Sequence, residues 1–130
     1  MQLPPSWSWF PDEAGGAAVF QPAGQTASSV LHIHVEGVDD SESLPNLSRM
    51  LAGFLTLRGR PVATDDLLEL DLPNTQAFAW QYQEGEQAVR VWVAGNELAW
   101  AFINFHCPVL LEAELRSDVD LIVASLVLRA

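Results

Sequence analysis

Lysine is absent from this sequence of 130 residues, and its six basic residues are arginines spread thinly along the chain. With 17 acidic residues, the net charge is −11. Affinity for nucleic acid depends largely on clustered basic side chains that neutralise phosphates, so no nucleic-acid partner is expected. An anionic membrane surface would repel this chain for the same reason. A basic or apolar partner fits the composition better.

Cysteine is nearly absent too: Cys107 is the only one, so no disulfide can form within the chain. The first residues lack the basic start and apolar core of a signal peptide. No apolar run approaches the ~20 residues of a membrane span. These absences predict a cytoplasmic protein without a membrane partner.

The sequence also lacks the short motifs of common catalytic sites. It contains no Gly-x-Ser-x-Gly elbow, no glycine-rich phosphate loop and no His-Glu-x-x-His pair. We therefore expect no cofactor and no enzymatic activity. What the sequence does have is 49% hydrophobic residues, which at this length predicts one self-sufficient domain over residues 1–130.

The first half predicts two strands, a helix and a further strand. Alternation of apolar and polar residues predicts strands at 17–21 and 28–35. A helix is expected to begin near Ser43 as its cap and to end at Gly59. Its apolar stripe consists of Leu44, Leu47, Leu51, Phe54 and Leu55. A leucine-rich strand follows at 67–72.

Residues 77–106 predict three antiparallel strands joined by turns at Glu84-Gly85-Glu86 and Gly95-Asn96. Turns centred there would pair Tyr82 with Ala88, Trp80 with Arg90 and Phe78 with Trp92. They would also pair Trp92 with Ala99, Val91 with Trp100 and Val89 with Phe102. Paired residues share a face of the sheet, so this pairing predicts two apolar faces. One face would hold Phe78, Trp80, Tyr82, Arg90, Trp92, Ala99, Ala101, Ile103 and Phe105; the other would hold Val89, Val91, Val93, Leu98, Trp100 and Phe102.

A last helix is expected after Pro108. Its apolar stripe consists of Leu111, Leu115, Val119, Ile122 and Leu126, with acidic residues on the outer side. The order of strands, helix, strands and helix predicts the α+β class, with an antiparallel β-sheet flanked by helices.

This order resembles the PsbP/Mog superfamily, including its DcrB-like bacterial branch. The resemblance is carried by Leu3-Pro4-Pro5-Ser6-Trp7, by the strand pair through His32-Ile33-His34-Val35, and by the sheet that ends in Trp100-Ala101-Phe102-Ile103-Asn104-Phe105-His106-Cys107-Pro108. The closing Ser125-Leu126-Val127-Leu128 is similar to the family's last hydrophobic segment.

The resemblance implies a PsbP-like α/β/α sandwich. Members of this superfamily act mainly as binding proteins: an extrinsic photosystem II subunit, a Ran-binding import factor, and chaperones that hold the transmembrane segments of type VI secretion effectors. This chain lacks an export signal and shows no residue-level match to the Ran-binding surface. The effector chaperones fit best, because they are short, cytoplasmic and built around an apolar sheet face.

The predicted aromatic face is our candidate for a partner-binding site, made of Phe78, Trp80, Tyr82, Arg90 and Trp92. Trp and Arg are over-represented at binding hot spots, and Arg90 beside Trp80 would permit a cation–π contact. The alternative is that one of the protein's own helices covers this face, since Ala99 and Ala101 would let a helix approach closely. In that case the face of Val89, Val91, Trp100 and Phe102 is the open one.

A metal site is a weaker alternative. His32 and His34 lie two residues apart on one strand, and His106 could supply a third ligand, but no zinc-type Cys/His spacing accompanies them. Cys107 follows His106 directly, so their side chains diverge if both lie in a strand. Three functional hypotheses follow: a chaperone-like module for a protein or peptide, a homodimer-forming structural subunit, and a His-dependent metal enzyme.

Overall fold

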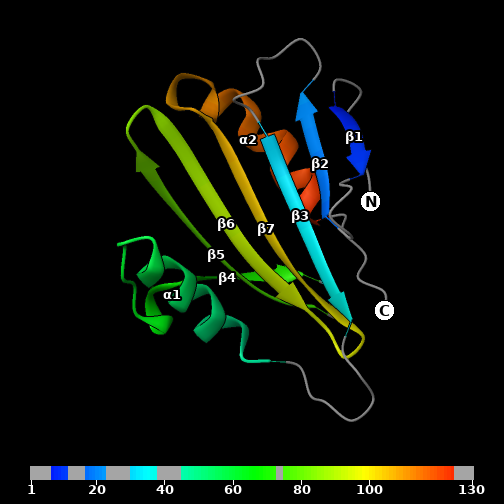
Figure 1. Ribbon diagram of the computed structural model, residues 1–130, viewed down its shortest axis with the longest axis vertical. Coiled ribbons are helices and arrows are strands. Elements are labelled where there is room, and N and C mark those ends of the chain that lie inside the picture. Colours follow the sequence, from blue (N-terminus) through cyan, green and yellow to red (C-terminus); the bar gives the residue numbers. More distant parts are fainter. Residues whose placement is uncertain (1–6, 12–16, 23–29, 38–44, 73–74, 125–130) are drawn as a thin grey trace. The chain divides into compact units, whose positions relative to one another are not determined.

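The computed structural model describes residues 7–11, 17–22, 30–37, 45–72 and 75–124. Within them, seven strands form one antiparallel sheet in the order β1-β2-β3-β7-β6-β5-β4 (Figure 1). The strands are β1 (Trp7–Pro11), β2 (Ala17–Pro22), β3 (Val30–Gly37), β4 (Leu68–Leu72), β5 (Thr75–Glu84), β6 (Gln87–Gly95) and β7 (Ala99–Pro108). Together with the two helices α1 (Leu47–Leu57) and α2 (Val109–Ala124), they confirm the α+β class.

The predicted strands and both helices are present, and β1 is a strand that the sequence did not predict. Residues 7–11 end in a proline and carry two tryptophans without a clear alternation, so the pattern for a strand is weak there. β1 pairs antiparallel with β2, placing Trp9 opposite Phe20. A short 3₁₀ turn, Thr64–Asp66, also went unpredicted.

Helix α1 begins later than predicted. Its cap is Asn46, whose side-chain Oδ1 accepts a hydrogen bond from the Arg49 backbone N–H at 3.1 Å. The predicted cap, Ser43, lies outside the described residues. Gly59 ends the helix as expected, with a φ of 74° that suits glycine.

The chain divides into two compact units. The first contains described residues within 1–34, Gln81–Arg90 and 103–124; the second contains 35–80 and Val91–Phe102. In the first unit, α2 buries Leu115, Val119, Ile122 and Val123. In the second, α1 buries Leu47, Leu51 and Leu55. These residues confirm most of the predicted apolar stripes. The predicted Phe54 and Leu111 are only half-buried, Val123 was not predicted, and Leu44 and Leu126 lie outside the described residues.

Candidate functional site

In the first unit, Arg90 is engaged by helix α2. A backbone hydrogen bond from the Val109 N–H to the Glu86 carbonyl oxygen at 2.9 Å joins the first residue of α2 to the turn before β6. Counting inward from that pair places Arg90 opposite Phe105. The Arg90 guanidinium lies 2.9 Å from the Asp120 carboxylate, and its side chain is only 15% exposed. Arg90 therefore serves an internal ion pair.

Asp118, two residues before Asp120 in α2, makes a second polar contact. The indole Nε1–H of Trp7 donates to Asp118 Oδ2 at 3.1 Å, and the Trp7 ring lies 6.1 Å from that of Phe105. Trp7 and Phe105 are 6% and 2% exposed. The side of β7 that carries Phe105 is thus covered in this unit.

The turn between β5 and β6 corrects the first set of predicted pairs. It contains two residues, Gly85 and Glu86, and Gly85 has a φ of 62°, as tight hairpin turns require. Glu84 therefore lies opposite Gln87, and Gln81 lies opposite Arg90. The predicted pairs Tyr82–Ala88, Trp80–Arg90 and Phe78–Trp92 are wrong by one residue.

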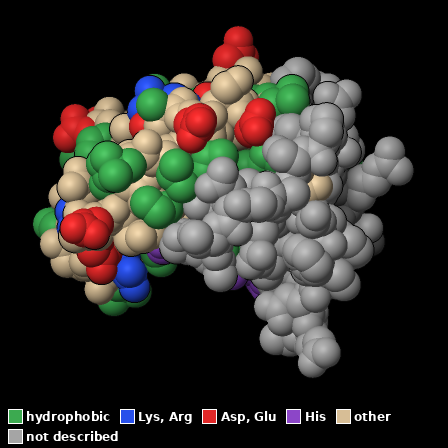
Figure 2. Space-filling view, turned by 90° about the horizontal axis from the view of Figure 1, so that it is seen from above, with side chains coloured by type: hydrophobic (Ala, Val, Ile, Leu, Met, Phe, Trp, Pro, Cys, Tyr) green, Lys and Arg blue, Asp and Glu red, His purple; other side chains and the backbone are tan. Residues whose placement is uncertain are grey.

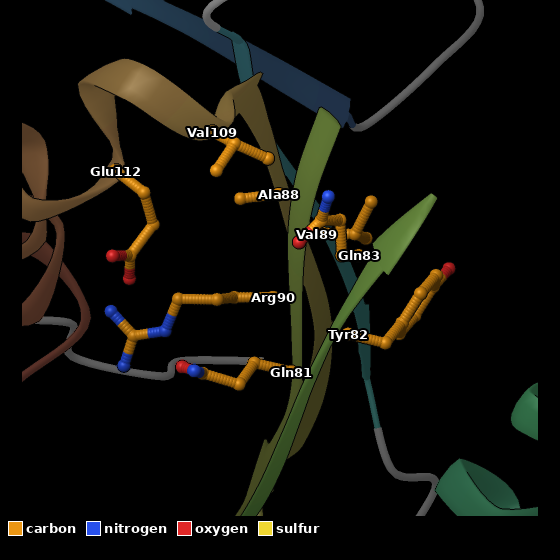
Figure 3. Close-up of a pocket in the computed structure, with 8 residues that line it drawn as sticks. All are labelled: Gln81, Tyr82, Gln83, Ala88, Val89, Arg90, Val109 and Glu112. Carbon is orange, nitrogen blue, oxygen red and sulfur yellow. The ribbon is translucent and has the colours of Figure 1, made fainter. Parts of the chain in front are cut away.

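A shift of one residue moves every side chain of a strand to the other face. Figure 3 shows the result: Gln81 extends on the same side of the sheet as Arg90, whereas Tyr82 points away from Arg90 and Glu112. Because side chains alternate along β5, Trp80 and Phe78 follow Tyr82. The predicted aromatic face is therefore split, with Arg90 and Trp92 on one side and Phe78, Trp80 and Tyr82 on the other.

The turn between β6 and β7 corrects the second set of pairs without changing faces. Asn96 donates its backbone N–H to the Ala99 carbonyl at 2.9 Å, and its side-chain oxygen accepts from the Leu98 and Ala99 N–H groups. Asn96 therefore lies opposite Ala99, and Val93 opposite Phe102. The predicted pairs Trp92–Ala99, Val91–Trp100 and Val89–Phe102 are wrong by four residues, an even number that leaves each side chain on its predicted face.

In the second unit, one side of the sheet is sealed. We call it the alanine side: Ala77, Ala79, Trp92, Ala94, Ala99 and Ala101. None of these residues is more than 5% exposed, and Trp92 is 1% exposed. The predicted alternative, that Ala99 and Ala101 lie on a covered face, agrees with this burial.

The other side of the same strands carries larger side chains. Those of β5 and β7 are partly buried, whereas Val91 and Val93 of β6 on this side are fully buried. We call its partly exposed aromatic residues the aromatic surface: Phe54, Phe78, Trp80, Trp100 and Phe102. The last four come from β5 and β7, and Phe54 comes from α1. The Phe54 ring lies 4.8 Å from the Phe102 ring at 63°, an edge-to-face contact that anchors the helix on this side. All five residues are partly exposed.

The sequence signal for this arrangement was present in the first turn. A glycine as the first residue of a two-residue turn favours the Gly85-Glu86 hairpin over a loop centred on Gly85. That choice joins Phe78 and Trp80 to Trp100 and Phe102 and removes Arg90 and Trp92 from the set. The aromatic surface thus combines two predicted residues with Trp100 and Phe102 of the face named as the open one if the first were covered. Val89 and Val91 of that face are buried.

A pocket of about 230 Å³ opens in the first unit, between the β5–β6 hairpin and the start of α2 (Figure 3). Its lining residues are Gln81, Tyr82, Gln83, Ala88, Val89, Arg90, Val109 and Glu112. Its two charged side chains each have an opposite charge nearby. Arg90 is paired with Asp120, and both Glu112 oxygens accept hydrogen bonds from Arg116 at 2.6 and 2.8 Å.

The histidines and the cysteine do not form a cluster. His32 and His106 are half-buried and His34 is exposed. Among the described residues, no group of three or more His, Cys, Asp or Glu side chains is placed to hold a metal ion. Burial, with a further contribution from the charge of Glu112, raises the pKa of the Cys107 thiol from 9.0 to about 11. Such a thiol is a poor nucleophile at neutral pH, because only the thiolate attacks.

Acidic and apolar side chains adjoin one another on the described surface. Figure 2 shows hydrophobic side chains gathered beside Asp and Glu side chains over the described part of the face in view. In the described part of the chain, no helix is both long and apolar enough to cross a membrane.

No family model matches this chain, and no curated protein matches it either. A crystal structure of a protein from Bacteroides thetaiotaomicron VPI-5482 is similar in fold, with a TM-score of 0.60 and 16% sequence identity. The similarity covers 100% of this chain and 44% of that one. The chain therefore spans less than half the length of its structural neighbour, and at this identity the likeness concerns the fold alone.

Proposed function

We propose that this chain is a non-enzymatic, chaperone-like binding module that holds a protein or peptide partner against the aromatic surface. The observation that carries the proposal is the contrast between the two sides of the sheet in the second unit. Every residue of the alanine side is buried, whereas Trp80 and Trp100 on the other side are partly exposed beside the fully buried Val91 and Val93.

Partly exposed aromatic side chains supply what a binding surface needs. A partner can bury the apolar surface that these residues still expose, and Trp is enriched among residues whose removal costs most binding energy. The two β5 residues were already predicted as partner contacts. The resemblance to the PsbP/Mog superfamily, whose members mainly bind other macromolecules, supports the same interpretation, and the proposal places the protein in the cytoplasm.

The test compares a double substitution on this surface with a matched one elsewhere. Trp80→Ser with Trp100→Ser removes two rings from the aromatic surface. Leu110→Ser removes a side chain of α2 that is 94% exposed and lies outside that surface. A protein captured by the wild-type chain is identified and purified, and its Kd is then measured for all three forms.

We expect the double substitution to weaken binding by about 100-fold, because two hot-spot side chains contribute roughly 1–2 kcal/mol each. The Leu110→Ser form should bind like the wild type. Equal binding by all three forms would refute the proposal. A wild-type dimer that becomes monomeric with the double substitution, measured by light scattering, would instead favour the alternative of a homodimer-forming structural subunit.

A further inference from the structure

Strand β4 forms one edge of the sheet, and this edge lies in the second unit. β4 pairs with β5 in the register Leu68–Ala79, Leu70–Ala77 and Leu72–Thr75. Within the described residues, no strand pairs with its other edge. In an antiparallel pair, alternate residues turn their N–H and C=O groups toward the neighbouring strand, and the residues between them turn theirs outward. The outer edge of β4 therefore presents backbone donors and acceptors to an incoming strand.

The side chains of β4 give this edge a distinct chemistry on each face. Leu68 is 58% exposed, and Leu70 and Leu72 are half-buried. Leu68 lies opposite the buried Ala79, and Leu70 lies opposite the buried Ala77. The apolar side of the sheet therefore extends to this edge, where its last side chains are partly exposed. On the other face Glu69 and Asp71 are exposed, and Glu69 lies opposite Phe78 of the aromatic surface.

We infer that the outer edge of β4 binds an extended segment of the partner by strand addition, and that this segment alternates apolar with basic residues. Its apolar side chains would cover the leucines, and Lys or Arg would lie opposite Glu69 and Asp71. The inference deepens the proposed function and rests on it, because it specifies how the partner held at the aromatic surface is bound. The segment should have about five residues, the length of β4.

Charge argues against a second copy of this chain as the occupant. Two β4 strands paired antiparallel about Leu70 would place Glu69 of each copy opposite Asp71 of the other, on the same face. Like charges directly opposite one another destabilise strand pairing. Natural edge strands often carry lysine to prevent self-association, but this chain has none. Here carboxylates would exclude further copies while favouring a basic strand, so that repulsion and attraction together select the partner.

The experiment uses the full chain and synthetic peptides of about seven residues, long enough to pair with all of β4. One peptide alternates Leu with Lys, the second alternates Leu with Glu, and the third repeats the Leu/Lys sequence with alternate backbone N–H groups methylated. Binding is followed by NMR titration of the protein's backbone amide signals, which reports both the Kd and the strand that is contacted.

The matched protein variants carry equal changes in charge. Glu69→Lys with Asp71→Lys reverses the charges on β4. Asp65→Lys with Asp66→Lys changes the net charge equally in the exposed turn just before β4. For the wild type we expect the Leu/Lys peptide to bind at least about 10-fold more tightly than the Leu/Glu peptide, with shifts in β4 amides. The β4 variant should reverse this preference, and the turn variant should keep it. N-methylation should abolish binding, because it removes the ladder hydrogen bonds.

Four results would overturn the inference. Equal weakening by the two charge variants would show that binding follows net charge alone. Undiminished binding of the methylated peptide would exclude a strand ladder. Self-association of the wild type through β4 would make a second copy the occupant. If the captured partner no longer binds the Trp80→Ser, Trp100→Ser form but still binds the β4 variant, the inference is overturned and the proposed function stands. If the captured partner no longer binds the β4 variant but still binds the Trp80→Ser, Trp100→Ser form, the edge site stands and the aromatic surface is not the binding site.

Discussion

The two sides of the sheet in the second unit are both apolar in composition, yet their aromatic and alanine side chains differ in solvent exposure. The alanine side is sealed, with small side chains and the fully buried Trp92. The aromatic surface carries the larger rings and stays half-buried. Small side chains on the alanine side permit close approach of whatever lies over them. On the other side Val91 and Val93 of β6 are also fully buried, so the partly exposed residues there are the aromatic ones of β5, β7 and α1.

Two tryptophans on neighbouring strands give the largest expected effect. Trp92→Ala should lower the free energy of unfolding by about 3–5 kcal/mol, because it empties a fully buried site. Trp80→Ala, on the aromatic surface, should cost about 1 kcal/mol, because water already reaches the ring. Urea denaturation of both variants measures the difference. A loss for Trp80→Ala as large as that for Trp92→Ala would break the comparison.

An enlarged alanine tests close approach on the sealed side. Ala101 is 0% exposed, so Ala101→Leu should destabilise the protein by about 1–3 kcal/mol through overpacking. The same change at Ala113, which is exposed on α2, serves as the control and should lie within about 0.5 kcal/mol of the wild type. Thermal or urea unfolding of the two variants measures the difference. If Ala101→Leu is as stable as the wild type, nothing packs tightly against position 101.

The ion pair in the first unit should have a smaller effect. Arg90→Met keeps the length of the side chain but removes the charge that faces Asp120. We expect a loss of about 1 kcal/mol, since the arginine is mostly buried while the 54%-exposed carboxylate can turn to water. Asp120→Asn should cost less. If unfolding in urea shows no change for Arg90→Met, the pair does not hold α2 in place.

Cys107 provides an effect that is confined to high pH, and with it a test of burial in the first unit. Because burial raises its pKa from 9.0 to about 11, the unfolded chain loses the thiol proton first as the pH rises. The contribution of the thiol to stability is therefore complete below about pH 9 and is lost as the pH rises through about 11. Cys107→Ala should lack this loss, which pH-dependent urea unfolding of the two forms would reveal. Identical pH profiles would contradict the burial of the thiol.

The elements could be predicted from the sequence because their patterns are local. Leu51 and Leu55 repeat with the period of a helix, and residues 99–107 alternate with the period of a strand, which the burial of every second residue confirms. The cap of α1 was missed because both Ser43 and Asn46 are good caps, and the choice depends on which side chain reaches a backbone N–H.

The register, in contrast, depends on single residues in the turns. Glu84-Gly85-Glu86 is compatible with a loop of two or three residues, and the difference decides on which side Arg90 and Trp80 lie. At the next turn the error was even, because Asn96 holds the Leu98 and Ala99 N–H groups and moves the turn onward. Of the five predicted site residues, Phe78 and Trp80 belong to the aromatic surface, and Arg90 and Trp92 lie on the other side of the sheet. Tyr82 shares the side of Phe78 and Trp80 along β5 but belongs to the first unit.

The tryptophan indole N–H signals offer the most direct measurement of the central claim, that the aromatic surface is where the partner binds. In NMR spectra of the labelled full chain, addition of the captured partner should shift the signals of Trp80 and Trp100 and leave that of Trp92 unchanged. A shift of the Trp92 signal with Trp80 and Trp100 unaffected would contradict the account.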